Sequence, residues 1–138
     1  MSWLVETLLL NRHNTRINPD FESDEYNNLL IVERKIKDLV KIGTIDRFEL
    51  AILDYVSSNK PYSTLQHLLG ISRNTIANYF KRICDRISYS LGGMFTDEGF
   101  LEYMKEKYNL TEEQIEQMRN HMKSRYRHTI RRIPHGRN

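Results

Sequence analysis

The sequence is poor in cysteine, with Cys84 alone among its 138 residues. A single cysteine excludes an intramolecular disulfide and a cysteine-rich zinc module, and it suits a reducing compartment. No apolar run approaches the roughly 20 residues that a membrane-spanning helix needs. No basic residue precedes the apolar start of the chain, so we expect no secretion signal either. These absences predict a cytoplasmic protein with no membrane partner.

Glycine and proline are also scarce, at six and three residues. Because both residues break helices, their scarcity predicts a mostly helical chain, as do the many Leu, Ile, Lys, Glu and Arg residues. No alternating strand pattern and no internal repeat stand out. The length is that of one domain, and 39% hydrophobic with 28% charged residues is typical of a globular protein. We therefore predict an all-α fold in one compact helical domain.

Signatures of catalysis are absent as well. The sequence holds no glycine-rich phosphate loop, no nucleophile elbow and no paired-carboxylate pattern. His121, His128 and His135 recur every seven residues, which on a helix separates neighbours by roughly 10 Å, too far to share a metal ion. Cys84 is expected to be a small buried hydrophobe, and the acidic segment 20–25 a solvated helix start. We therefore expect neither an enzyme nor a bound cofactor or metal.

Positive charge is concentrated at the C-terminal end. The whole chain carries a net charge of +3, but residues 119–138 hold seven cations and no acid, so the remaining residues sum to −4. The seven cations are Arg119, Lys123, Arg125, Arg127, Arg131, Arg132 and Arg137. This asymmetry predicts an anionic partner for the basic end, with nucleic acid as the first candidate and an acidic protein surface as the alternative.

Hydrophobic periodicity and capping residues divide the chain into seven predicted helices. A loop is expected over 13–23, and the helices cover about 2–12, 25–41, 46–58, 63–69, 72–91, 97–107 and 111–132. The predicted N-terminal caps are Ser2, Ser23 or Asp24, Thr44 or Asp46, Ser63, Ser72, and Thr111 in a capping box with Gln114. The helices form an N-terminal segment (1–45), a central unit (46–91) and a C-terminal pair with a basic tail (92–138).

The central unit has the order of parts that a helix-turn-helix requires. Leu69-Gly70-Ile71-Ser72 joins a short predicted helix to a longer one through a glycine, a buried aliphatic residue and a serine cap. Gly70 allows the left-handed backbone of the turn, and Ser72 accepts from the first free N–H groups of the next helix. The positions predicted to face inward are Leu65, Leu68, Leu69, Ile76, Phe80, Ile83 and Ile87.

The outward face of the longer helix carries polar side chains suited to DNA. Asparagine can bond adenine, and arginine guanine, through paired hydrogen bonds in the major groove, while a threonine methyl can contact thymine. We predict that this face includes Arg73, Asn74, Ala77, Asn78, Lys81, Arg82 and Asp85, with Thr75 at its border. The predicted DNA-binding residues are Ser72, Arg73, Asn74, Thr75, Asn78, Lys81, Arg82 and Arg86 on this helix, and Arg125, Arg127, Arg131 and Arg132 in the basic tail.

Residues 46–91 resemble sigma-factor region 4 and the helix-turn-helix regulators related to it, including the ArpU-type phage transcription regulators. The likeness is carried by Leu69-Gly70-Ile71-Ser72 and by Thr75-Ile76 within the segment 62–76. The pattern usually has alanine or another small residue where this chain has Gln66 and His67, and no counterpart of the promoter-melting region 2 is present. The resemblance implies DNA binding by the helix that begins at Ser72 and, in many members, contact with RNA polymerase.

The favoured function is a sequence-specific double-stranded DNA-binding transcription regulator encoded by a phage or prophage. Two alternatives stay open: a phage small terminase subunit, which recognises DNA for packaging and assembles into a ring, and a module that docks on RNA polymerase. We expect a homo-oligomer, with a dimer as the simplest form, because one module contacts few bases.

The C-terminal half is unusually rich in aromatic residues and methionine. Packing against the helix-turn-helix is the favoured explanation, and a dimer face is the alternative. The residues concerned are Tyr89, Phe95, Phe100, Tyr103, Met104, Tyr108, Ile115 and Met118.

Overall fold

The computed structural model describes residues 2–132, with side chains for residues 2–123, and all regular secondary structure in this part of the chain is helical. The all-α prediction is therefore confirmed. The helices are α1 (Trp3–Leu10), α2 (Arg12–Ile17), α3 (Asp24–Lys41), α4 (Arg47–Ser57), α5 (Tyr62–Leu69), α6 (Arg73–Leu91), α7 (Asp97–Tyr108) and α8 (Glu112–Arg132), with a 3-10 turn, η1 (Gly93–Phe95), before α7.

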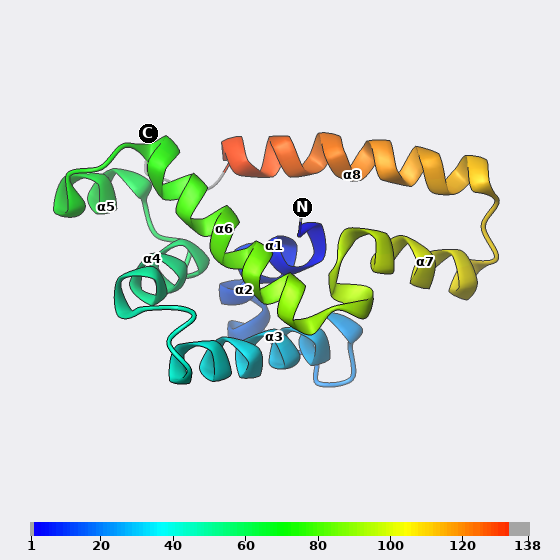
Figure 1. Ribbon diagram of the computed structural model, residues 1–138, viewed down its shortest axis with the longest axis horizontal. Coiled ribbons are helices and arrows are strands. Elements are labelled where there is room, and N and C mark those ends of the chain that lie inside the picture. The colour runs from blue at the N-terminus through cyan, green and yellow to red at the C-terminus, as the bar shows by residue number, and fades with distance from the viewer. Residues whose placement is uncertain (1, 133–138) are drawn as a thin grey trace.

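Helix α6 runs through the middle of the molecule and organises the main core (Figure 1). It packs against α1, α3, α4 and α5. Its inward stripe of Ile76, Phe80, Ile83 and Ile87 has no exposed surface, as predicted, and Cys84 is fully buried beside it. Residues of the predicted N-terminal segment and of the central unit therefore share one core.

Helices α7 and α8 form an antiparallel hairpin with a small cluster of its own, seen at the right of Figure 1. Leu101, Ile115 and Met122 are buried there, and Trp3 of α1 packs on them with Phe100, whose ring centroid lies 5.3 Å away. The prediction that this aromatic-rich half packs against the helix-turn-helix is therefore wrong for most of its residues. The exposed members are Tyr89, Tyr103 and Tyr108, and Phe95 alone joins the main core.

Most of the predicted caps are confirmed by hydrogen bonds. Ser23 accepts from the backbone N–H of Tyr26, and Ser72 accepts from that of Thr75. Asp46 and Glu49 form a capping box at the start of α4, and Thr111 and Gln114 bond reciprocally at the start of α8. These helices therefore begin where local side-chain chemistry satisfies their free N–H groups.

Two predicted side-chain caps are not formed, at the starts of α1 and α5. The Ser2 hydroxyl donates to the carboxylate of Glu6, one turn along α1, and makes no capping bond. Helix α5 begins at Tyr62 directly after Pro61, so Ser63 lies inside its first turn. Pro61 is extended, with φ −66° and ψ 135°, and its ring fixes φ near the value that the chain needs directly before the helix.

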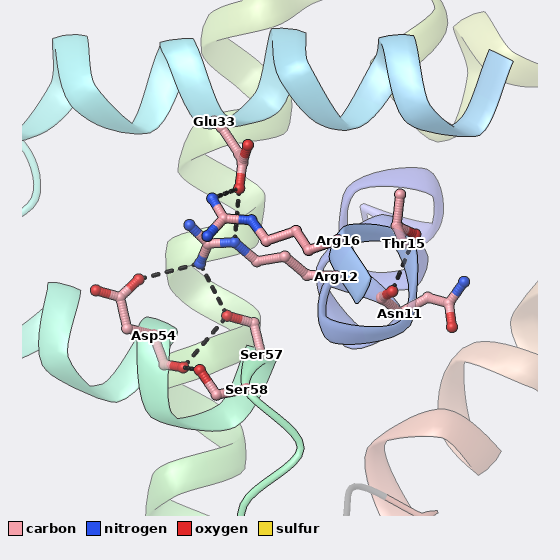
Figure 2. A network of polar contacts seen from close by, with 8 residues as sticks. All are labelled: Asn11, Arg12, Thr15, Arg16, Glu33, Asp54, Ser57 and Ser58. Carbon is pink, nitrogen blue, oxygen red and sulfur yellow. Dashed lines mark hydrogen bonds and ion pairs between the residues drawn. The ribbon is translucent and has the colours of Figure 1, made fainter. Parts of the chain in front are cut away.

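The expected loop over 13–23 contains the short helix α2, which a polar network holds in place (Figure 2). Arg12 donates to Glu33 of α3 at 2.8 Å, and to Asp54 and Ser57 of α4 at 3.0 Å each. Arg16 pairs with the same carboxylate of Glu33. The six residues of α2 are too few to be stable alone, so these contacts with α3 and α4 account for the helix.

Candidate nucleic-acid interface

The turn between α5 and α6 has the geometry that the sequence predicts. Gly70 adopts φ 67° and ψ 29°, and its N–H donates to the carbonyl of Gln66 at 2.8 Å, which ends α5. Ser72 accepts from the N–H of Thr75 at 3.1 Å, and the two hydroxyl oxygens lie 2.9 Å apart. Both hydroxyls thus contribute to the cap at the start of α6.

The outer side of α6 presents a polar row. Asn74, Asn78 and Arg82 are all exposed, and their spacing of four residues places them along one side of the helix. The Arg82 guanidinium lies 4.9 Å from the ring centroid of Tyr79, which in turn packs edge-on against Phe48 of α4. This stack restrains the guanidinium at the surface, since a cation is attracted to an aromatic face. We call Asn74, Asn78 and Arg82 the polar row.

Two further predicted site residues flank the polar row. Arg73 is exposed at the first position of α6, and Lys81 is half-buried beside the row. Burial raises the pKa of the Tyr62 hydroxyl on α5, and the positive charge of Arg73 opposes that rise. Ala77, predicted to face outward, is only 6% exposed, so that prediction is wrong. Three and seven residues further on lie buried Phe80 and Cys84, so Ala77 belongs to the inner stripe.

Arg86 lies away from the polar row, where it joins α6 to the start of α4. Its guanidinium donates to the Thr44 carbonyl at 2.7 Å and pairs through both terminal nitrogens with the Glu49 carboxylate. Hydrogen bonding from Arg86 holds the pKa of Glu49 below its ordinary value, and the same bond raises the pKa of Arg86. Because these partners already satisfy the guanidinium, we leave Arg86 out of the candidate interface.

Replacing Glu49 by glutamine tests this pairing through pH. A carboxylate with a lowered pKa in the folded state stabilises the fold above its unfolded pKa of 4.5, and that stability is lost as pH falls through the folded value. Glu49→Gln should therefore cost about 1–3 kcal/mol above about pH 5, and the cost should shrink progressively as pH falls through the lowered pKa of Glu49. Glutamine keeps the capping box, so urea unfolding across this pH range isolates the pairing with Arg86. An equal cost at every pH would contradict the assignment.

Helix α5 contributes an exposed surface beside the turn that the sequence does not reveal. Leu68, predicted to face inward, is 70% exposed, and His67 next to it is also exposed. The prediction fails because this eight-residue helix buries only Tyr62 and Leu65 on its inner side. Leu68 and Leu69 follow Leu65 by three and four residues, and they lie on opposite sides of it around the helix. Both spacings are typical of a buried helix face, so the sequence pattern alone does not show which of the two leucines is exposed.

The basic tail lies only partly within the described structure. The backbone of Arg125, Arg127, Arg131 and Arg132 belongs to α8, but their side chains lie outside the described part, as does Arg137 altogether. Nearer the body, Arg119 is held by Glu98 at 2.9 Å and by Glu116 at 2.5 Å, whereas Lys123 is exposed. Arg119 is thus engaged within the hairpin of α7 and α8.

Metal-binding and membrane-spanning features are not found in the described residues. No group of three or more His, Cys, Asp or Glu side chains there is placed to hold a metal ion, and no helix there is both long and apolar enough to cross a bilayer. Burial raises the pKa of the Cys84 thiol well above its ordinary value, which disfavours the reactive thiolate. His128 and His135 lie outside the described side chains.

Comparisons with protein-family models, with curated proteins and with solved structures find no match to this chain. The geometry of α5 and α6 therefore carries the functional argument.

Proposed function

We propose that this chain is a sequence-specific, double-stranded DNA-binding regulator of transcription that places α6 in the major groove. The observation that carries the proposal is the polar row, which projects from a helix that begins one cap residue and one aliphatic residue after a left-handed glycine turn. In a helix-turn-helix the N-terminal part of the second helix meets the base edges, and Asn74 and Asn78 occupy that part of α6.

The side-chain chemistry of the polar row supports base recognition. Asparagine can donate to and accept from the edge of adenine, and arginine can donate twice to guanine. Restraint of Arg82 by Tyr79 supports this role, since a guanidinium held in place loses less entropy when it binds. The exposed Leu68 and His67 on α5 flank the same turn and offer contacts beside the groove.

The proposal is tested by selecting duplexes from a random-sequence DNA pool with the full chain, and then measuring affinities for the selected site and for random DNA. Asn78→Ala should cost about 1–3 kcal/mol on the selected site and little on random DNA. Asn120→Ala, which removes an exposed asparagine from α8, is the matched control and should leave both affinities unchanged. Equal losses on both kinds of DNA would contradict base recognition by α6.

The selection, together with sedimentation of the protein, separates the proposal from its two alternatives. A module that docks on RNA polymerase would enrich no sequence and show little salt-dependent DNA affinity. A small terminase subunit would bind DNA but sediment as a ring of many subunits. A regulator in the cytoplasm of a phage-carrying cell should bind its site as a small oligomer.

A further inference from the structure

The Arg82 side chain of the polar row is held by an aromatic ring and not by a carboxylate. Its guanidinium lies 4.9 Å from the ring centroid of Tyr79, which precedes it by three residues on α6. Arg86, about one turn further on, instead gives its donors to Glu49. No ion pair of Arg82 is found among the described residues. The N–H donors of Arg82 are therefore restrained at the surface and still available to a ligand.

The ring of Tyr79 is itself supported by a residue of another helix. Phe48, in the first turn of α4, packs edge-on against it with the ring centroids 5.5 Å apart. Aromatic pairs in this arrangement are favourable beyond the area that they bury. Phe48 is 43% exposed and Tyr79 is half-buried, so the pair lies at the surface and not deep in the core. The position of Arg82 therefore depends on a helix other than the one that carries the polar row.

The start of α4 is bound to α6, which keeps Phe48 in place. Glu49, the next residue, belongs to the capping box of α4 and also accepts from both terminal nitrogens of Arg86 on α6. Hydrogen bonding from Arg86 lowers the pKa of Glu49, and the positive charge of Arg82 adds to that effect. Because Arg86 makes the hydrogen bonds to this carboxylate, Arg82 is left against the ring of Tyr79.

We propose that Phe48 and Tyr79 are positioning residues that give the protein a preference for guanine at the base pair facing Arg82. The inference rests on the proposed function, which places α6 in the major groove. Guanine presents two acceptors on its major-groove edge, and a guanidinium held in one orientation can donate to both. A mobile guanidinium loses more entropy on binding, and it can also turn to a phosphate, which carries no sequence information. Helix α4 thus contributes to recognition without contacting a base.

Base preferences of the full chain test the proposal, through affinities for the selected site and for every single-base-pair change in it. Arg82→Ala should identify the base pair concerned by lowering the preference for guanine there about tenfold. Tyr79→Leu should lower the same preference about threefold to tenfold, and Phe48→Leu about twofold to threefold, with affinity for random DNA unchanged. Tyr79→Phe should keep the preference, because phenylalanine also presents a ring face to the cation. In an Arg82→Ala background, Tyr79→Leu should have no further effect on it.

Tyr55→Leu is the matched control. Tyr55 also belongs to α4 and also has a cation near its ring, with the Lys60 nitrogen 5.6 Å from the ring centroid. Because that cation is Lys60 and not a residue of the polar row, Tyr55→Leu should leave every base preference unchanged. Circular dichroism and thermal unfolding verify that each variant is folded.

A measurement without DNA separates failure of this inference from failure of the proposed function. In nuclear magnetic resonance spectra of the full chain, the Nε–H signal of Arg82 should be shifted by the ring and slow to reorient. Tyr79→Leu should abolish both properties, and Tyr79→Phe should keep them. The inference alone is overturned if Arg82 reorients freely in the wild-type protein. It is also overturned if a site is selected but Tyr79→Leu keeps its guanine preference, or weakens binding to every sequence equally, as loss of a phosphate contact would. If no sequence is selected, the proposed function fails with it, whatever the spectra show.

Discussion

Gly70→Val is expected to lower the free energy of unfolding by about 2–3 kcal/mol and to abolish selective DNA binding. This is the largest effect that we expect from a single substitution. At φ 67° the backbone of Gly70 is left-handed, a region that costs an L-residue roughly 1–2 kcal/mol and a β-branched residue more. A Cβ atom added at this position would meet nothing within 4 Å, so the cost comes from the backbone and not from a collision.

A substitution series separates backbone strain from other effects. Gly70→Asn should cost least because asparagine tolerates the left-handed region, Gly70→Ala should cost about 1–2 kcal/mol, and Gly70→Val most. Thermal and urea unfolding measure the order. If the three variants are equally stable, the turn does not depend on its left-handed residue.

Gly43→Val is the matched control for binding. Gly43 has φ +85° and is also open to solvent at its Cβ position, but it follows α3 and lies away from the turn between α5 and α6. It should lower stability as Gly70→Val does and leave the affinity of the folded protein for its selected site intact. Loss of binding in both variants would show that general destabilisation explains the effect.

Local chemistry makes the central helices predictable from the sequence. Helix α6 has a strong amphipathic pattern, a serine cap and a preceding glycine, and all three signals agree. The caps at Ser23, Asp46 and Thr111 work in the same way, since each bonds a backbone group within three residues. Such interactions depend on neighbours in the sequence and are therefore visible in it.

Features that depend on distant residues are not predictable in this way. Arg12 bonds partners 21 to 45 residues away, and nothing near it in the sequence marks α2 as a helix. Arg86 likewise has the spacing of a phosphate contact along α6, but Glu49 lies 37 residues earlier and takes its guanidinium. The partners of such side chains depend on how the helices pack together, and the hydrophobic periodicity of a single helix carries no information about that packing.

The candidate interface also combines features that the local sequence predicts with features that depend on distant residues. The exposed positions of Asn74, Asn78 and Arg82 follow from helical periodicity, and the sequence predicts them. The stack of Arg82 on Tyr79 and of Tyr79 on Phe48 joins two helices, and the sequence does not predict it, although it restrains a proposed base contact. Contact between the polar row and bases stays a proposal that the binding measurements decide.

Deleting residues 125–138 is expected to produce the largest change in the salt dependence of DNA binding. The deletion removes five cations and no acid. For every phosphate that the protein no longer neutralises, the slope of log K against log salt should flatten by about 0.9, so removing most of the five cations gives a change of roughly 3 to 4. The ratio of affinities for the selected site and for random DNA should barely change, because phosphate contacts position a protein without recognising sequence.

We expect this deletion to leave the body folded, because the described core contacts of α8 come from residues before position 125. Among the described side chains, the buried contacts of α8 with α7 come from Ile115 and Met122, with Met118 beside them, and all three precede the deleted residues. Arg119 also keeps its pairs with Glu98 and Glu116 and so has little charge to offer DNA. The remaining salt dependence should come from Lys81, Arg82 and Lys123.

The control for the deletion removes cations elsewhere on the surface. Lys105→Gln/Lys107→Gln takes two cations from α7 that pair with Glu112 and Asp24 within the chain, and should leave the slope unchanged. If the truncated protein keeps the full salt slope, the tail does not contact DNA. Its charge would then serve an acidic protein surface, and docking on RNA polymerase would become the better explanation of the basic end.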